Sequence, residues 1–141
     1  MQQENTLADL FGEPIYSYTR QNAIDDGVLI DVTEASKEAG FSIPVAVTST
    51  VWDQYIEWTE EDSERQTYQD QSGRLWDVLW MARMGISGGN KDKSQIMFQL
   101  DCVPRAPAST ARMARLTTLK MHIGAGDNHE PVVTIMLPDE D

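Results

Sequence analysis

Carboxylate side chains are concentrated between residues 57 and 70. The set comprises Glu57, Glu60, Glu61, Asp62, Glu64 and Asp70, and Asp25 and Asp26 add two more nearer the N-terminus. If residues 48–64 form one helix, the four glutamates lie on adjacent turns of one face. Carboxylates at that spacing can meet the arginine and lysine side chains that otherwise hold phosphates. The pattern predicts an acidic binding surface, and the competing interpretation is a solvated helix end.

Aromatic side chains are interleaved with these carboxylates. Trp52, Tyr55, Trp58 and Tyr68 occur in or beside the acidic stretch. Aromatic residues next to charged ones are effective anchors of protein interfaces. We expect most of the four in the core and Trp58 partly exposed, because it lies off the main apolar face of its helix. Trp58 and Tyr68 are therefore the candidate interface aromatics.

A second class of function comes from residues 15–31, which read IYSYTRQNAIDDGVLID. This run resembles the start of small ADP-ribosyltransferase or phosphotransferase domains, although no His or Arg occupies their early-strand position. The resemblance implies a nucleotide site near residues 15–32, with Ser17, Tyr18, Thr19 and Arg20 facing a dinucleotide. An ordinary capped helix explains the same residues.

Other catalytic and metal chemistry finds little support in the sequence. His122 and His129 are the only histidines, Cys102 is the only cysteine, and no metal-ligand spacing is present. Cys102 falls on the apolar face of an expected strand, where cysteine behaves as a small hydrophobe. We therefore expect no catalytic residue, no metal and no cofactor.

The negative charge is unevenly distributed along the chain. The net charge is −12, and residues 1–72 hold fifteen of the 23 acidic residues but only three of the eleven basic ones. Such a field repels nucleic-acid phosphates and favours basic partners. We expect a basic protein partner and no direct binding of nucleic acid, although solubility alone also explains the charge.

Length and composition favour one domain over residues 1–141, with residues 1–12 as a frayed start. The chain has 141 residues, 40% of them hydrophobic, and four tryptophans, which is enough for a core. A polar, acidic N-terminus without a signal peptide and a single cysteine favour the cytoplasm. We expect no membrane association, because the longest apolar run is too short to span a bilayer.

The expected fold class is α+β. Residues 73–85, GRLWDVLWMARMG, predict a central Trp-rich helix that is buried on most sides, since eight of its eleven interior residues are apolar. Short strand-helix units precede it: strands at 15–18 and 28–32, and helices at 20–25, capped by Thr19, and from 33 to 40. Alternation at 96–103 and 116–123 and an apolar run at 132–137 predict a C-terminal three-stranded antiparallel meander.

Four segments together resemble a family of short uncharacterised proteins from plasmids, phages and integrated elements of Gram-negative bacteria. They are LFGEPIYSYTRQNAIDDGVLIDV, FSIPVAVTSTVW, GRLWDVLWMA and VVTIMLPDED. The resemblance implies a mobile-element setting, where many small acidic proteins block host defence. The leading hypothesis is thus a non-enzymatic interaction module that inhibits a host defence or nucleic-acid-handling complex, of the anti-CRISPR or antirestriction type. The alternatives are the nucleotide-dependent transferase and a homodimeric structural protein.

Overall fold

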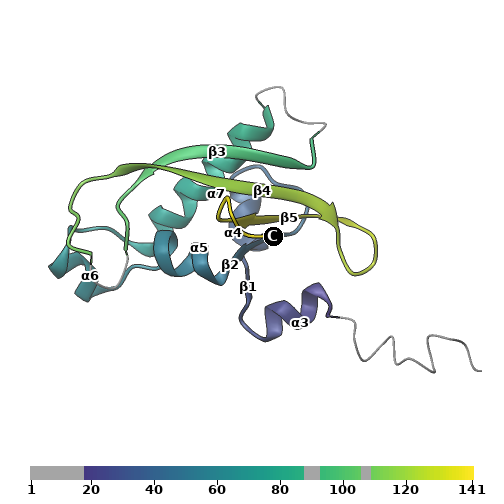
Figure 1. Cartoon of the computed structure of the whole chain (residues 1–141), viewed down its shortest axis with the longest axis horizontal. Helices are drawn as coiled ribbons and strands as arrows, with labels where there is room; N and C mark the ends of the chain where they lie inside the picture. The colour runs from purple at the N-terminus through teal and green to yellow at the C-terminus, as the bar shows by residue number, and fades with distance from the viewer. Residues whose placement is uncertain (1–17, 88–92, 106–108) are drawn as a thin grey trace, which may run out of the picture.

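A five-stranded mixed sheet forms the centre of this computed structural model, which describes residues 18–87, 93–105 and 109–141. The strands are β1 (Leu29–Asp31), β2 (Val45–Thr48), β3 (Gln95–Cys102), β4 (Arg115–Ala125) and β5 (Pro131–Met136). The helices are α3 (Arg20–Asp25), α4 (Thr33–Glu38), α5 (Ser49–Val51), α6 (Glu60–Arg65) and α7 (Gln71–Ser87), with a π-helical turn η1 (Trp52–Ile56). Figure 1 shows their arrangement, an α+β fold.

The predicted separate three-stranded antiparallel meander is wrong. The sheet order is β1-β2-β5-β4-β3, and β5 pairs in parallel with β2 as well as antiparallel with β4. Residues 45–47 are buried on both faces of β2, so this short strand shows no alternation that would reveal its position. Its pairing of Val45 with Val133 joins segments far apart in the chain, which local periodicity does not detect.

The short helix α3 begins where its capping residue Thr19 predicts. The Thr19 side chain accepts a hydrogen bond from the Asn22 backbone N–H, and Oδ1 of Asn22 accepts one from the Thr19 backbone N–H. Gly27 and Gly40 follow α3 and α4 with φ values of 78° and 106°, which suit glycine. The predicted strand at 15–18 and the frayed segment 1–12 lie outside the described residues except for Tyr18, which is not in a strand.

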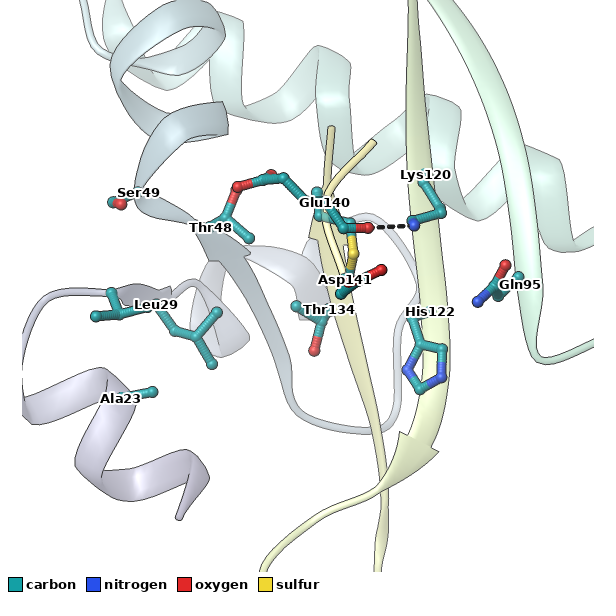
Figure 2. A pocket seen from close by; sticks show the side chains of 12 residues that line it. Ala23, Leu29, Thr48, Ser49, Gln95, Lys120, His122, Thr134, Glu140 and Asp141 are labelled. Atoms are coloured by element: carbon teal, nitrogen blue, oxygen red, sulfur yellow. Dashed lines mark hydrogen bonds between the residues drawn. The ribbon is translucent and has the colours of Figure 1, made fainter. Parts of the chain in front are cut away.

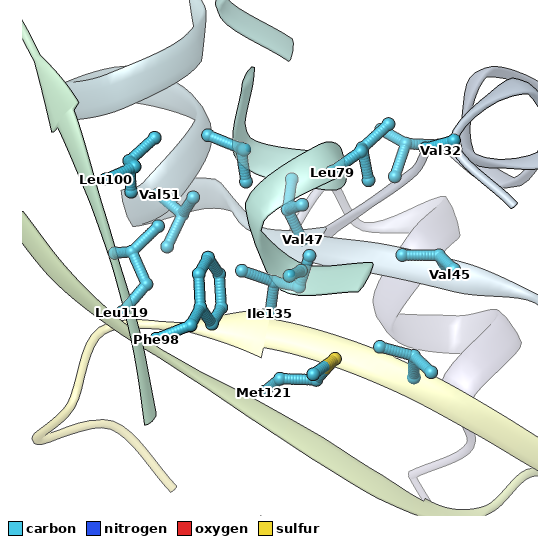
Figure 3. Packing of buried hydrophobic residues seen from close by; sticks show 14 of the residues in the cluster. Val32, Val45, Val47, Val51, Leu79, Phe98, Leu100, Leu119, Met121 and Ile135 are labelled. Carbon is cyan, nitrogen blue, oxygen red and sulfur yellow. The ribbon is translucent and has the colours of Figure 1, made fainter. Parts of the chain in front are cut away.

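The prediction that the central helix is buried on most sides is wrong. α7 packs Val78, Leu79 and Ala82 against one face of the sheet (Figure 3). Trp76 and Trp80 are 40% and 41% exposed, and their rings stack with centroids 5.5 Å apart. A helix on the surface of a single sheet has one covered side, so the remaining apolar side chains face outward.

The condition for one acidic helical face, a single helix over residues 48–64, is not met. Thr48 caps α5, which continues directly into η1, and Glu57 then leaves the helical region with ψ 137°. A new helix, α6, starts after Thr59, whose side chain accepts from the Asp62 N–H. Glu57 therefore follows η1, Glu60 to Glu64 lie on α6, and Asp70 precedes α7, so the acidic residues do not share one helical face.

The two faces of the sheet have different coverings. Leu119 and Met121 of β4 point into the core together with residues of α4, α5, η1 and α7. Lys120 and His122 alternate with them, so they lie on the opposite face. That face is bordered by α3 and by the chain after β5, and a pocket opens there (Figure 2).

The two sides of α7 predict different costs of truncation. Leu79→Ala removes a fully buried side chain and should lower the free energy of unfolding by about 3 kcal/mol. Trp80→Ala removes a half-exposed ring and should cost about 1 kcal/mol, the scale of one aromatic pair. Urea denaturation of both variants checks this; equal losses would contradict the one-sided packing.

Candidate functional site

The guanidinium of Arg74 joins the acidic stretch to the core. This buried side chain donates from Nε to the Ile56 carbonyl at 3.1 Å and from Nη1 to the Val103 carbonyl at 2.9 Å. Nη1 also donates to Oε1 of Gln69 at 2.6 Å. One side chain thus fixes the ends of η1 and β3 and the segment that leads into α7.

Trp58 lies beneath this guanidinium. The Arg74 Cζ is 4.4 Å from the centroid of the Trp58 ring, and the indole N–H donates to Oγ of Ser63 at 3.0 Å. The expectation that Trp58 is partly exposed is wrong, because only 6% of the residue is exposed. The face of the ring stabilises the buried Arg74 guanidinium. Because the ring is itself buried, it is unavailable as an interface anchor.

Asp62 is buried as well, with 2% exposure, although it belongs to the predicted acidic surface. Its carboxylate accepts from Nε of Arg105 at 2.6 Å and from Nη2 of Arg65 at 2.7 Å. Burial raises the pKa of Asp62, but the hydrogen bonds from Arg105, Thr59 and Arg65 outweigh it and hold the pKa well below its ordinary value. Asp62 therefore stabilises the start of α6.

Two more contacts hold the 59–70 segment in place. The buried Gln66 amide donates to the Pro104 carbonyl at 2.7 Å and to the Ala111 carbonyl at 2.8 Å. Arg105 also forms an ion pair with Glu57 at 3.5 Å, which offsets the charge of that half-buried carboxylate. Glu57 and Asp62 therefore contribute little free negative charge to the surface.

The remaining carboxylates of this region are exposed around Tyr68. Glu60, Glu61 and Glu64 project from α6, and Asp70 accepts from the Gly73 N–H at 2.6 Å, so that it caps α7. Tyr68 is 83% exposed. A groove of about 540 Å³ is lined by Glu60, Glu64, Tyr68 and Asp70 among others.

Two further grooves continue this one along α7. The first shares Tyr68 and Asp70 and reaches Trp76 and Asp77. The second shares Asp77 and extends past Trp80 to β3 and β4. We define the acidic–aromatic surface by the side chains that line these grooves: Glu60, Glu64, Tyr68, Asp70, Trp76, Asp77 and Trp80. Carboxylates alternate with aromatic rings along it.

The sequence pattern alone does not reveal the part of this surface that belongs to α7. Trp76, Trp80 and Met84 recur at intervals of four, which places them on one side of a helix. The other side is also apolar, so the pattern did not show which side faces the core. Within this surface, burial raises the pKa of Asp77, and the nearby Arg74 opposes the shift.

Asp25 and Asp26 do not join the acidic–aromatic surface. They lie at the end of α3, which Figure 1 shows well to the right of α6 and below the sheet. The Asp25 carboxylate accepts from the Gln21 amide at 2.9 Å, and the Asp26 carboxylate accepts from the Tyr18 hydroxyl at 2.7 Å. The eight predicted acidic residues are thus divided between two regions.

Two of the four residues proposed to face a dinucleotide, Thr19 and Arg20, instead make contacts within the fold. The Asp127 carboxylate accepts from the backbone N–H groups of Arg20 and Gln21 at 2.8 and 3.0 Å. The Arg20 guanidinium donates to Oγ1 of Thr134 at 2.6 Å and to the Val133 carbonyl at 2.8 Å. These are the donors that a phosphate would need. Thr19 caps α3, Tyr18 is exposed, and Ser17 lies outside the described residues.

Within residues 18–87, 93–105 and 109–141, no three side chains of His, Cys, Asp or Glu form a group that could hold a metal ion. Cys102 is buried, and burial raises the pKa of its thiol above the ordinary value. In the same part of the chain, no helix has the length and apolar character needed to cross a membrane.

Comparison with known proteins assigns the chain to a family. Residues 8–141 match a family of unknown function, DUF6573. The chain belongs to this family. No curated protein and no solved structure matches it.

Arg74→Lys tests the role of the buried guanidinium. Lysine keeps the charge but cannot form the same set of hydrogen bonds or stack on the Trp58 ring. The free energy of unfolding should fall by about 2–3 kcal/mol, measured by urea denaturation. Arg112→Lys, at an exposed position, is the matched control and should behave as wild type; a stable Arg74→Lys protein would contradict the assignment.

Asp62→Asn tests the buried carboxylate and its pH dependence. The substitution should cost about 3 kcal/mol at pH 7, because two arginines lose a charged partner. The pKa of Asp62 is lower in the folded protein than its unfolded value of about 3.9. Its stabilisation is therefore complete well above that value and is lost as the pH falls below it.

The measurement is the difference in unfolding free energy between wild type and Asp62→Asn at neutral and acidic pH. The difference should shrink on acidification. Glu61→Gln changes an exposed carboxylate of the same helix and should alter stability by less than about 0.5 kcal/mol. A pH-independent difference would contradict the role of the ionised carboxylate.

Proposed function

We propose that this protein is a non-enzymatic interaction module that binds a basic protein through the acidic–aromatic surface. The observation that carries the proposal is the continuity of the three grooves. Tyr68 and Asp70 line both the first and the second groove, and Asp77 lines both the second and the third. Exposed carboxylates attract arginine and lysine side chains, and exposed rings offer faces on which a guanidinium stacks. The expected partner segment is therefore rich in arginine.

The local charge balance supports a basic partner. Glu60, Glu64, Asp70 and Asp77 line these grooves. Arg74, the one cation among the residues that line them, is buried and uses its donors on backbone carbonyls and Gln69. The carboxylates are thus left to face solvent, where they repel nucleic-acid phosphates and steer a basic surface toward the protein.

We further propose that the partner is a nucleic-acid-handling protein of a host defence complex, of the restriction or CRISPR type. Basic surfaces that normally hold phosphates are the natural targets of an ordered row of carboxylates. The proposed mobile-element origin of the protein rests on its resemblance to short proteins from plasmids and phages. Its direct test is a phage or plasmid challenge with and without the protein.

Charge reversal tests the binding surface. The triple variant Glu60→Lys, Glu64→Lys and Asp77→Lys should weaken binding of a fluorescent oligoarginine peptide by about tenfold or more, since three exposed pairs contribute up to about 1 kcal/mol each. Fluorescence anisotropy measures the affinity. Affinity should fall as salt is added, because exposed charge pairs are screened.

The matched control reverses three exposed carboxylates elsewhere, Glu34, Glu38 and Asp139, and gives the same change in net charge. Its affinity should stay near that of wild type. Trp76→Ala should reduce the preference for oligoarginine over an oligolysine of equal length, because a guanidinium stacks better on indole than an ammonium does. Equal losses in both triple variants would refute a localised surface.

A further inference from the structure

A pocket of about 570 Å³ lies on the sheet face opposite α7 (Figure 2). Its apolar lining includes Leu29 and Met136. Its polar lining includes Gln95, His122 and Thr134, which the strand register places in one row across β3, β4 and β5. A largely apolar cavity of this size with a few converging polar groups is typical of small-molecule sites.

The cationic group that lines this pocket is Lys120, and the acidic residues Glu140 and Asp141 line it as well. The residue is only 7% exposed, although its neighbours Leu119 and Met121 fill the core on the other face of β4. Its ammonium donates a hydrogen bond to the backbone carbonyl of Glu140, as Figure 2 shows. Within the described ranges it forms no ion pair with a carboxylate. A buried ammonium without a carboxylate at ion-pair distance is costly.

The bonding capacity of Lys120 is only partly used. An ammonium has three N–H donors, and the Glu140 carbonyl accepts one of them. The Glu140 carboxylate is engaged elsewhere, because its Oε1 accepts from Oγ1 of Thr48 at 2.9 Å and from the Leu137 N–H at 2.7 Å. A carboxylate ligand in the pocket could accept from the ammonium directly and pair with its charge at contact distance.

We propose that this pocket binds a small monocarboxylate with an apolar body, held by Lys120. One buried positive charge matches one negative charge. The side chains of Glu140 and Asp141 also line the pocket, and they disfavour ligands with several negative charges, such as nucleotides. The apolar lining from Leu29 and Met136 favours a hydrocarbon body. This site lies on the other face of the sheet from α7 and is independent of the proposed protein-binding surface.

Calorimetric titration with octanoate and with octanol tests the proposal, because the two ligands differ in charge but share a chain length. Wild type should bind octanoate about ten- to a hundredfold more tightly than octanol, the scale of hydrogen bonds to a charged group. The nearly isosteric Lys120→Met should abolish that preference. Lys37→Met, which removes an exposed lysine, should retain it.

Nitrogen-edited NMR spectra of the unaltered protein give a readout that does not depend on a variant. Octanoate should shift the amide signals of Gln95, His122 and Thr134 and leave those of Tyr68 and Trp76 unchanged. Acetate and inorganic phosphate are the probes without an apolar body. The proposal is overturned if either binds as tightly as octanoate, if octanol matches octanoate, or if octanoate shifts no signal of the pocket.

Discussion

The buried guanidinium of Arg74 is the constraint on which the arrangement of the acidic stretch depends. It lies on the Trp58 ring and binds carbonyl groups at the ends of η1 and β3. A cation in this position needs all of these partners, because burial without them is unfavourable. The segment between η1 and α7 is therefore fixed to the sheet, and Trp76 and Asp77, the next residues of the acidic–aromatic surface on α7, are fixed with it.

The acidic residues of α6 thus have two different physical roles. Asp62 is buried between Arg65 and Arg105 and stabilises the segment, whereas Glu60 and Glu64 on the same helix are exposed. The buried carboxylate orders the backbone from which the exposed ones project. An acidic surface held in this way loses little conformational entropy on binding, which favours affinity.

The two faces of the sheet carry the two binding sites that we propose. α7 covers one face and turns its tryptophans outward, where a basic protein is the expected partner. The opposite face carries Lys120 and His122 and encloses a pocket of small-molecule size. Because β4 alternates, its core residues Leu119 and Met121 position Lys120 on the other face without a further element.

The sequence by itself determined the local features: the Thr19 cap of α3 and the alternation of β3. These depend on residues within one turn or one strand. The tertiary structure alone decided the place of β2 in the sheet, the burial of Trp58 and the exposed side of α7. Each of these depends on partners distant in the chain, such as Val133 for Val45, and a helix that is apolar on both sides carries no local signal of which side the sheet covers.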